Sequence, residues 1–204
     1  MNSKNKIKKN KKLIIAVTGI PATGKTTFAK KLSKEINIEN LEINGFAKHH
    51  DVYIGKDSFG TKIVDIKKLS KLLNKYIKKN RKDLILVGHL AADLNIKYDV
   101  AIILRSNLKT LAKRMERRGY PIEKIRENLI AEANDYCSKI KKYAKETYEV
   151  ETEAEIDKVV QYLKCLEKVS KYKKISCKKP EIKSSHYHFP ELLDLINKGN
   201  KYKL

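Results

Sequence analysis

Apolar residues form short, continuous runs at several points of the chain. The clearest runs cover residues 13–18, 84–87 and 100–104, and they are rich in aliphatic and β-branched side chains. A run without polar alternation is typical of a strand that is buried on both faces, as in a parallel sheet. Shorter candidates lie near Leu41 and over residues 147–150. The pattern therefore predicts buried strands at the centre of the fold.

Between these runs, apolar side chains recur at the spacing of amphipathic helices. Residues 64–78 and 153–169 show this most clearly, because aliphatic side chains gather on one side of each segment. Further helices are expected over residues 26–36, 107–117 and 121–145. Pro121 is a favourable first residue for the last of these. Strands that alternate with helices indicate an α/β fold with a parallel sheet.

The two ends and one internal segment depart from this alternation. Residues 41–62 show no clear period, so we expect a short strand followed by an irregular excursion. Residues 1–12 are rich in lysine and nearly devoid of apolar side chains, which predicts a disordered basic arm. We expect one core domain over residues 13–169. Residues 170–204 are expected to form a basic extension with a short helix near 190–197.

The chain of 204 residues has a formal net charge of +22. Such an excess attracts polyanions such as RNA, although solvated lysine-rich helix faces are an alternative explanation. No run of about 18 apolar residues and no signal-peptide core occurs, so we expect a cytoplasmic protein without a membrane partner. Cys137, Cys165 and Cys177 are widely spaced, and we expect them to be ordinary reduced thiols.

One motif lies between the first predicted strand and the first predicted helix. It runs from Gly19 to Thr26 and reads GIPATGKT. Backbone N–H groups of such a loop converge on phosphate oxygens at a helix N-terminus. Gly19 and Gly24 allow the close approach, Lys25 reaches the β and γ phosphates of ATP, and the Thr26 hydroxyl binds Mg²⁺. The position of this motif predicts a P-loop.

P-loop enzymes usually have a carboxylate for the Mg²⁺ shell at the end of a neighbouring strand. Here that position is Val87. Asp83 begins the same strand and is expected to point away from the phosphates, while Asp93 is at best a substitute from a loop. His89 follows closely and is a candidate to orient water or contact the γ-phosphate. A histidine satisfied at a strand end is the alternative.

Arginines gather in the second half of the predicted core. Arg114, Arg117 and Arg118 precede the break at Gly119, where guanidinium groups can clamp phosphate oxygens. Arg105 follows a predicted strand directly, at the edge of the sheet where ligands bind in such folds. Solvated arginines on a basic protein are the alternative for these side chains.

Four stretches together resemble the adenylate kinase isoenzyme six family. They read GIPATGKTT, VGHL, LRSN and RRGYPIEKIRENLIAEA, and the resemblance covers about residues 13–165. It implies a P-loop NTPase fold with a five-stranded parallel sheet flanked by helices. It also implies a small nucleoside monophosphate kinase that acts as an ATPase in small ribosomal subunit maturation.

The resemblance also implies functional residues and partners. An acceptor segment is expected over residues 43–58, beginning at Ile43 and ending at Ser58, and a short lid over residues 117–127, ending at Glu127. Further implied partners are a ribosomal protein of the S-eleven family and rRNA. Nucleotide contacts are implied at Ala22, Gly24, Lys25, Thr26, Thr27 and Arg118.

Three departures from the family matter. Its Asp-x-His motif appears as Val87-Gly88-His89, which keeps the histidine and loses the carboxylate, so we expect slow chemistry. The acceptor segment has no arginine, so phosphate capture must rest on lysines, backbone or an outside residue such as Arg105. The lysine-rich tail exceeds the family pattern and enlarges the surface available to RNA.

Three functions remain in view. The first is transfer of the ATP γ-phosphoryl group to AMP or a related monophosphate, with Lys25, Arg118, His89 and Mg²⁺ at the site. The second is a nucleotide-gated ribosome assembly factor with little kinase activity. The third is a P-loop kinase acting on RNA ends or on a small metabolite. The P-loop specifies the phosphate donor and leaves the acceptor open.

Overall fold

The computed structural model describes residues 12–58, 60–171 and 176–182. The strands of the central sheet are Ile14–Thr18 (β1), Asn40–Glu42 (β2), Leu84–Val87 (β5), Tyr98–Leu104 (β6) and Ala144–Val150 (β7). Within the described residues these five strands are parallel and lie in the order β2-β5-β1-β6-β7. The expected α/β fold with a five-stranded parallel sheet is confirmed.

Helices connect the strands. Their bounds are Lys25–Ile36 (α1), Ile43–His49 (α2), Ile66–Lys79 (α3), His89–Ala92 (η1, a 3₁₀ helix), Leu108–Arg117 (α4), Ile122–Ala133 (α5), Tyr136–Lys142 (η2, also 3₁₀) and Glu153–Lys171 (α6). Side chains fix two of the starts. Asp65 accepts a hydrogen bond from the Lys68 amide at α3, and Asn107 does the same for Lys109 at α4.

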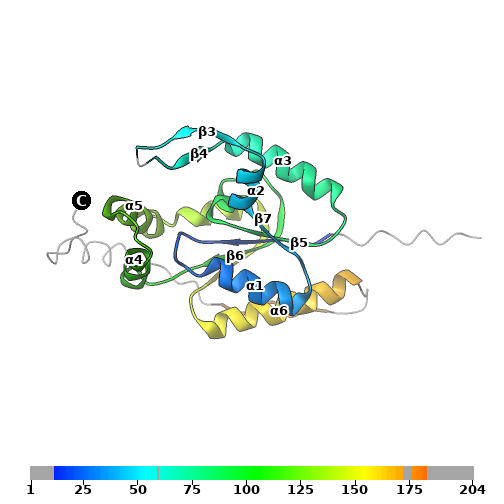
Figure 1. Cartoon of the computed structure of the whole chain (residues 1–204). Helices are drawn as coiled ribbons and strands as arrows, with labels where there is room; N and C mark the ends of the chain where they lie inside the picture. The colour runs from blue at the N-terminus through cyan, green and yellow to red at the C-terminus, as the bar shows by residue number, and fades with distance from the viewer. Residues whose placement is uncertain (1–11, 59, 172–175, 183–204) are drawn as a thin grey trace, which may run out of the picture.

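The sheet is covered on both faces. Successive residues of a strand point to opposite sides, so Ile15 and Val17 of β1 pack in one cluster with α1 and α6. Ile14 and Ala16 pack in a second cluster with α3, α4 and α5. Figure 1 shows α1 and α6 on one side of the sheet, α2 and α3 on the other, and α4 stacked with α5 at one end. This double burial explains why the strand sequences are continuously apolar.

The excursion over residues 41–62 is more regular than its sequence suggested. It contains α2 and an antiparallel hairpin of β3 (Tyr53–Lys56) and β4 (Lys62–Val64). In α2, Ile43 and Ala47 are completely buried. A helix of seven residues spans only about two turns, which is too short for its period to stand out in the sequence.

The helix expected over residues 121–145 is shorter, and that prediction was wrong. It ends at Ala133, and Asp135 then adopts the left-handed region with φ 53°. Aspartate tolerates this conformation better than most residues, so the chain turns there into η2. Apolar side chains continue at helical spacing through η2, which is why the sequence pattern concealed the break.

The expectation of three reduced cysteines is corrected by the structure. Cys165 of α6 and Cys177 form a disulfide, while Cys137 is a buried free thiol. Residues 176–182 lie in the predicted C-terminal extension, yet Cys177 and Ile182 pack against the core cluster next to α6. The chain therefore returns to the core after α6. Cys165 and Cys177 are 12 residues apart in the sequence, and this wide spacing gave no indication that they pair.

The ends of the chain complete the description. Lys12 donates hydrogen bonds of 2.5 Å to the carbonyls of Ile77 and Asn80 at the end of α3. The rest of the predicted basic arm and the short helix expected near 190–197 lie outside the described residues. Among the described helices, none combines the length and apolar character needed to cross a bilayer.

Candidate functional site

The loop between β1 and α1 has the conformation that a phosphate-binding turn requires. Gly19, Ala22 and Gly24 all have positive φ angles, of 142°, 69° and 96°. A Cβ at Gly19 would lie 2.5 Å from the Leu104 carbonyl oxygen and 2.8 Å from the Thr23 hydroxyl. Such contacts are too short for any side chain, so Gly19 is required by its neighbours as well as by its backbone.

Lys25, the first residue of α1, turns back over this loop. Its Nζ donates a hydrogen bond of 2.7 Å to the Ile20 carbonyl. Burial lowers the pKa of the Lys25 ammonium to about 8, and the nearby Arg118 acts in the same direction. The side chain therefore still carries its charge at neutral pH, in a place where desolvation strengthens its attraction for phosphate oxygens.

A cavity of about 280 Å³ opens above the loop. Lys25, Thr26 and Thr27 line it from α1, and Arg118 and Tyr120 line it from the turn after α4. The segment predicted as a lid thus begins at this cavity. We refer to this space as the phosphate cavity.

The three clustered arginines have different surroundings. Arg118 lines the phosphate cavity, as expected from the sequence. Arg114 donates a hydrogen bond of 3.2 Å to the Ala22 carbonyl and so braces the loop. Arg117 is exposed at the end of α4 and is not among the residues that line the phosphate cavity. Of the three, Arg118 is therefore the one that could contact a phosphate in this cavity.

A second cavity of about 410 Å³ adjoins the first. The two share Ala22, Gly24, Thr27 and Arg118, and the second extends toward α6. Its far wall combines apolar side chains, among them Phe28 and Ile156, with the acidic Glu151 and Glu153. A cavity that combines apolar and polar side chains in this way can accept a nucleoside base.

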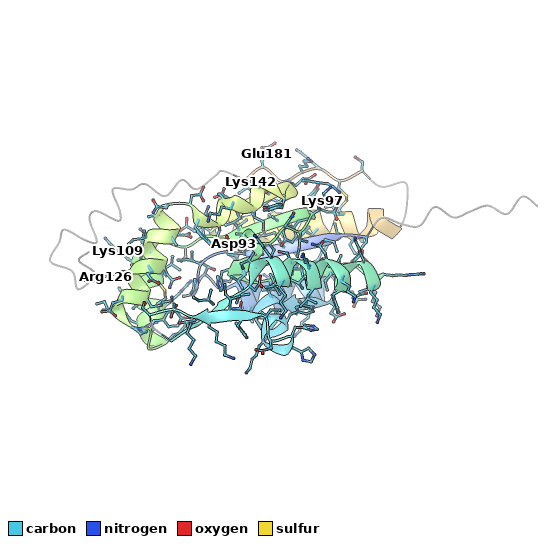
Figure 2. All side chains as sticks on the ribbon, turned by 90° about the horizontal axis from the view of Figure 1, so that it is seen from above. Asp93, Lys97, Lys109, Arg126, Lys142 and Glu181 are labelled. Atoms are coloured by element: carbon cyan, nitrogen blue, oxygen red, sulfur yellow. A yellow bond between two sulfur atoms is a disulfide. The ribbon has the colours of Figure 1, made fainter. Side chains whose placement is uncertain are left out.

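A third cavity of about 850 Å³ adjoins the phosphate cavity on the opposite side. The predicted acceptor segment contributes Asn44, Lys48 and Tyr53, and β4 contributes Lys62. The Lys62 ammonium lies 4.6 Å from the centre of the Tyr53 ring. We refer to this space as the acceptor cavity. Figure 2 shows Asp93, which also lines it, nearer the middle of the molecule than Lys109 of α4 and Arg126 of α5.

His89 lies where the phosphate and acceptor cavities meet, because it lines both. Burial lowers its pKa to about 4, and the neighbouring Lys25 charge adds to the effect. The imidazole is therefore neutral at physiological pH. A neutral ring at this junction can donate one hydrogen bond and accept another, which suits a positioning role.

Arg105 does not have the place expected of an acceptor ligand. It is 4% exposed, and its guanidinium group contacts the carboxylates of Glu132, Asp135 and Glu149. These ion pairs further raise the already high pKa of Arg105. It borders the second cavity, which extends toward α6, and not the acceptor cavity. The suggestion that Arg105 captures an acceptor phosphate is therefore corrected, because its guanidinium group already forms ion pairs with protein carboxylates.

One residue of the site was missed in the sequence. Glu42 ends β2 and accepts a hydrogen bond of 3.0 Å from the Thr26 hydroxyl to its Oε1. Val87 is buried at the expected carboxylate position, and Asp83 binds the Leu13 amide at the other end of β5, as expected. The signal was present as an acidic residue at the end of a short strand, but β2 has three residues and is too short to be aligned with β5 from the sequence.

Comparisons with known proteins identify relatives of this chain. A family model described as an AAA domain matches residues 15–135. A protein named "Putative adenylate kinase" from Methanocaldococcus jannaschii is 35% identical over 154 residues, covering 74% of this chain and 85% of that protein. A protein of the same name from Pyrococcus furiosus is 36% identical over 123 residues, covering 60% and 65%.

The shikimate kinase from Acinetobacter baumannii, solved in complex with shikimate, has a similar structure. Its TM-score is 0.54 at 15% identity, covering 80% of this chain and 97% of that one. Identity at this level shows a shared fold alone. The relatives carry more weight, because the Methanocaldococcus jannaschii protein is 35% identical over 74% of this chain. The chain thus belongs to the family of archaeal adenylate kinase-like proteins, as its motifs predicted.

Proposed function

We propose that this protein is an ATP-dependent nucleoside monophosphate kinase with AMP or a related monophosphate as acceptor. One observation carries the proposal: three cavities adjoin one another, with Lys25 and Arg118 on the central one. They offer, in order, a place for a base, for the transferred phosphates and for a second nucleotide. The names of the relatives support the same reaction.

The donor nucleotide is ATP. Its phosphates bind over the P-loop, with Lys25 and Thr26 at the N-terminus of α1, where the helix dipole also favours negative charge. Arg118 reaches them from the opposite wall. The further contacts proposed for ATP are Gly19, Ala22, Gly24 and Thr27.

Mg²⁺ fits the phosphate cavity. The described part of the chain holds no cluster of three or more His, Cys, Asp or Glu side chains able to bind a metal. Mg²⁺ characteristically enters with substrate phosphates and needs only one or two protein ligands. The Thr26 hydroxyl and the Glu42 carboxylate supply oxygens of this kind. When bound, Mg²⁺ neutralises charge on the β and γ phosphates.

The transfer needs little covalent chemistry from the protein. An acceptor phosphate oxygen attacks the γ-phosphorus of ATP, and the bond from that phosphorus to the β–γ bridging oxygen breaks. ADP leaves with the electron pair, and the acceptor becomes a diphosphate. Lys25 and Arg118 stabilise the charge that spreads over the transferred group, while His89 positions the reactants at the cavity junction.

Acceptor capture rests on lysines. Lys48 and Lys62 line the acceptor cavity, whereas Arg105 is held by carboxylates. A lysine ammonium attracts phosphate as a point charge and lacks the two-pronged geometry of arginine. We therefore expect weaker and less selective acceptor binding than an arginine pair would give.

A coupled assay of ADP formation tests the kinase. Wild type, Lys25→Ala and Lys30→Ala are compared with AMP, CMP or dAMP as acceptor. Lys30 is an exposed lysine on the same helix, so its variant controls for lost surface charge. Lys25→Ala should lower acceptor-dependent ADP formation by 100-fold or more, on the order of the loss of one electrostatic contact in a transition state. Equal rates in wild type and Lys25→Ala would contradict the proposal.

The charge of +22 favours a second role for the same protein, as an ATPase that assists small ribosomal subunit maturation. In this role nucleotide state controls docking on rRNA and on a ribosomal protein of the S-eleven family. RNA affinity should then fall steeply with salt, because each neutralised phosphate releases counterions. Affinity that is unchanged by salt or by nucleotide would count against this role.

A kinase for RNA ends or for a small metabolite is the remaining alternative. The P-loop binds the donor in every case, so the acceptor decides between them. ADP formation that is indifferent to all added monophosphates, yet stimulated by RNA ends or a metabolite, would favour this alternative.

A further inference from the structure

The end of β5 lacks the acidic side chain that the Mg²⁺ shell of a P-loop normally uses. Val87 occupies this place and is 2% exposed. Neighbouring carboxylates are committed elsewhere. Asp93 accepts a hydrogen bond from the Tyr136 hydroxyl and lines the acceptor cavity, and Glu132 is buried against Arg105.

Glu42 lies one strand away from the missing carboxylate. β2 pairs with β5 in parallel, and Glu42 is the direct register partner of Val87. Both strands therefore end at the same level beside the P-loop. Among the described residues that line the phosphate cavity, Glu42 is the one acidic side chain.

The contact with Thr26 fits a shared cation. Thr26 Oγ1 and Glu42 Oε1 are 3.0 Å apart. Two neighbouring oxygens around Mg²⁺, each about 2.0 to 2.1 Å from the ion, are separated by about 2.9 Å in an octahedron. The two oxygens are thus already spaced as a pair that a cation accompanying the phosphates can use.

We propose that Glu42 supplies the carboxylate for the Mg²⁺ of bound ATP and thereby replaces the acidic group absent from Val87. The inference rests on the proposed use of ATP at this site. It assigns a carboxylate role to β2 in place of β5. The expectation of slow chemistry, which was based on Val87 alone, changes accordingly: the site retains its carboxylate.

Nucleotide affinity with and without metal tests this assignment independently of activity. Binding of a non-hydrolysable ATP analogue is measured by calorimetry in Mg²⁺ and in EDTA for wild type, Glu42→Gln and Glu39→Gln. Glu39 is exposed just before β2, so its variant makes the same charge change away from the P-loop. Glu42→Gln should weaken binding in Mg²⁺ by about 10- to 100-fold, which is the usual effect of removing a side chain that supports a bound metal. In EDTA its affinity should equal or exceed that of wild type, because a negative charge near the phosphates is gone.

Glu42→Asp provides a second variant that keeps the carboxylate, and it should retain most of the gain in affinity with Mg²⁺. A Glu42→Gln protein whose gain with Mg²⁺ equals that of wild type would overturn the assignment. So would an equal loss of affinity in Mg²⁺ and in EDTA, which would indicate a purely structural contact. Failure of wild type to bind the analogue in either condition would overturn the proposed function and this inference together.

Discussion

Burial lowers the pKa of two side chains that line the phosphate cavity, Lys25 and His89. The pKa of Lys25 falls to about 8 and that of His89 to about 4, in both cases chiefly through desolvation. At neutral pH, incoming phosphates therefore meet a cation on the P-loop and an uncharged imidazole beside it. The charged Lys25 therefore suits attraction of phosphate, and the neutral His89 suits positioning.

His89 should make stability depend on pH. Because its folded pKa is lowered below the unfolded value of about 6.5, the unfolded chain takes up a proton first as pH falls. Wild type should lose on the order of 1 to 2 kcal/mol through this group between pH 7 and pH 5. Urea unfolding of His89→Asn at both values should show that much less loss. The exposed His49→Asn serves as control, and equal losses in wild type and His89→Asn would refute the shift.

Gly19 should not tolerate a side chain. A Cβ there would meet the Leu104 carbonyl at 2.5 Å in a backbone conformation with φ 142°. We expect Gly19→Ala to destabilise the fold by about 1 to 3 kcal/mol and to weaken ATP binding. Gly55→Ala, which meets no atom within 4 Å, should be nearly neutral. Denaturant unfolding and ATP titration of both variants check this, and an unaffected Gly19→Ala would contradict the loop geometry.

At the scale of elements, Arg105 ties the end of β6 to its neighbours. Its guanidinium group joins Glu132 of α5 and Glu149 of β7. These contacts hold the elements behind the site in place, which is a structural role.

Removal of Arg105 should therefore affect stability before acceptor binding. Arg105→Met leaves buried carboxylates without their partner and should lower the free energy of unfolding by about 3 to 5 kcal/mol. Adding Glu132→Gln should recover part of the loss. Denaturant unfolding measures both variants, with exposed Arg81→Met as control. Stability near that of wild type, together with a raised KM for AMP, would restore the acceptor role.

The elements differ in how far their sequences predict them. β5 was expected over residues 84–87 and has those bounds. A strand that is buried on both faces is a continuous apolar run, so its ends are visible in the sequence. α3 and α4 were also expected, since their apolar faces are long and regular. α2 was missed because two turns do not establish a period. The helix expected over residues 121–145 was too long, because one residue in the left-handed conformation, Asp135, breaks the chain direction after α5.

The site was predictable where one segment of chain makes it. Gly19, Lys25 and Thr26 lie within eight consecutive residues, so their chemistry could be inferred from spacing alone. The role proposed for Glu42 could not be inferred from the sequence, because it depends on the register between β2 and β5. The acceptor role expected of Arg105 could not be checked from the sequence either. Its position at the end of a strand was predicted correctly, but the carboxylates that bind it come from elements distant in the sequence.

At the scale of the whole molecule, the Cys165–Cys177 disulfide holds residues 176–182 to α6. Closing a loop of this size should contribute about 3 kcal/mol to stability through the unfolded chain. Reductant should therefore lower the Tm of wild type and leave a Cys165→Ser, Cys177→Ser double variant unchanged. Alkylation of the denatured, unreduced protein should label Cys137 alone. Labelling of all three cysteines would contradict the disulfide.

The central claim is the proposed transfer of a phosphoryl group from ATP to a nucleoside monophosphate. It rests on three adjoining cavities, with Lys25 and Arg118 lining the middle one. The most direct test follows the transferred group itself. The protein is incubated with ATP labelled at the γ-phosphorus, Mg²⁺ and AMP, and the products are separated. The account predicts that the label appears in ADP made from AMP. Label found solely in inorganic phosphate, at a rate independent of AMP, would contradict it.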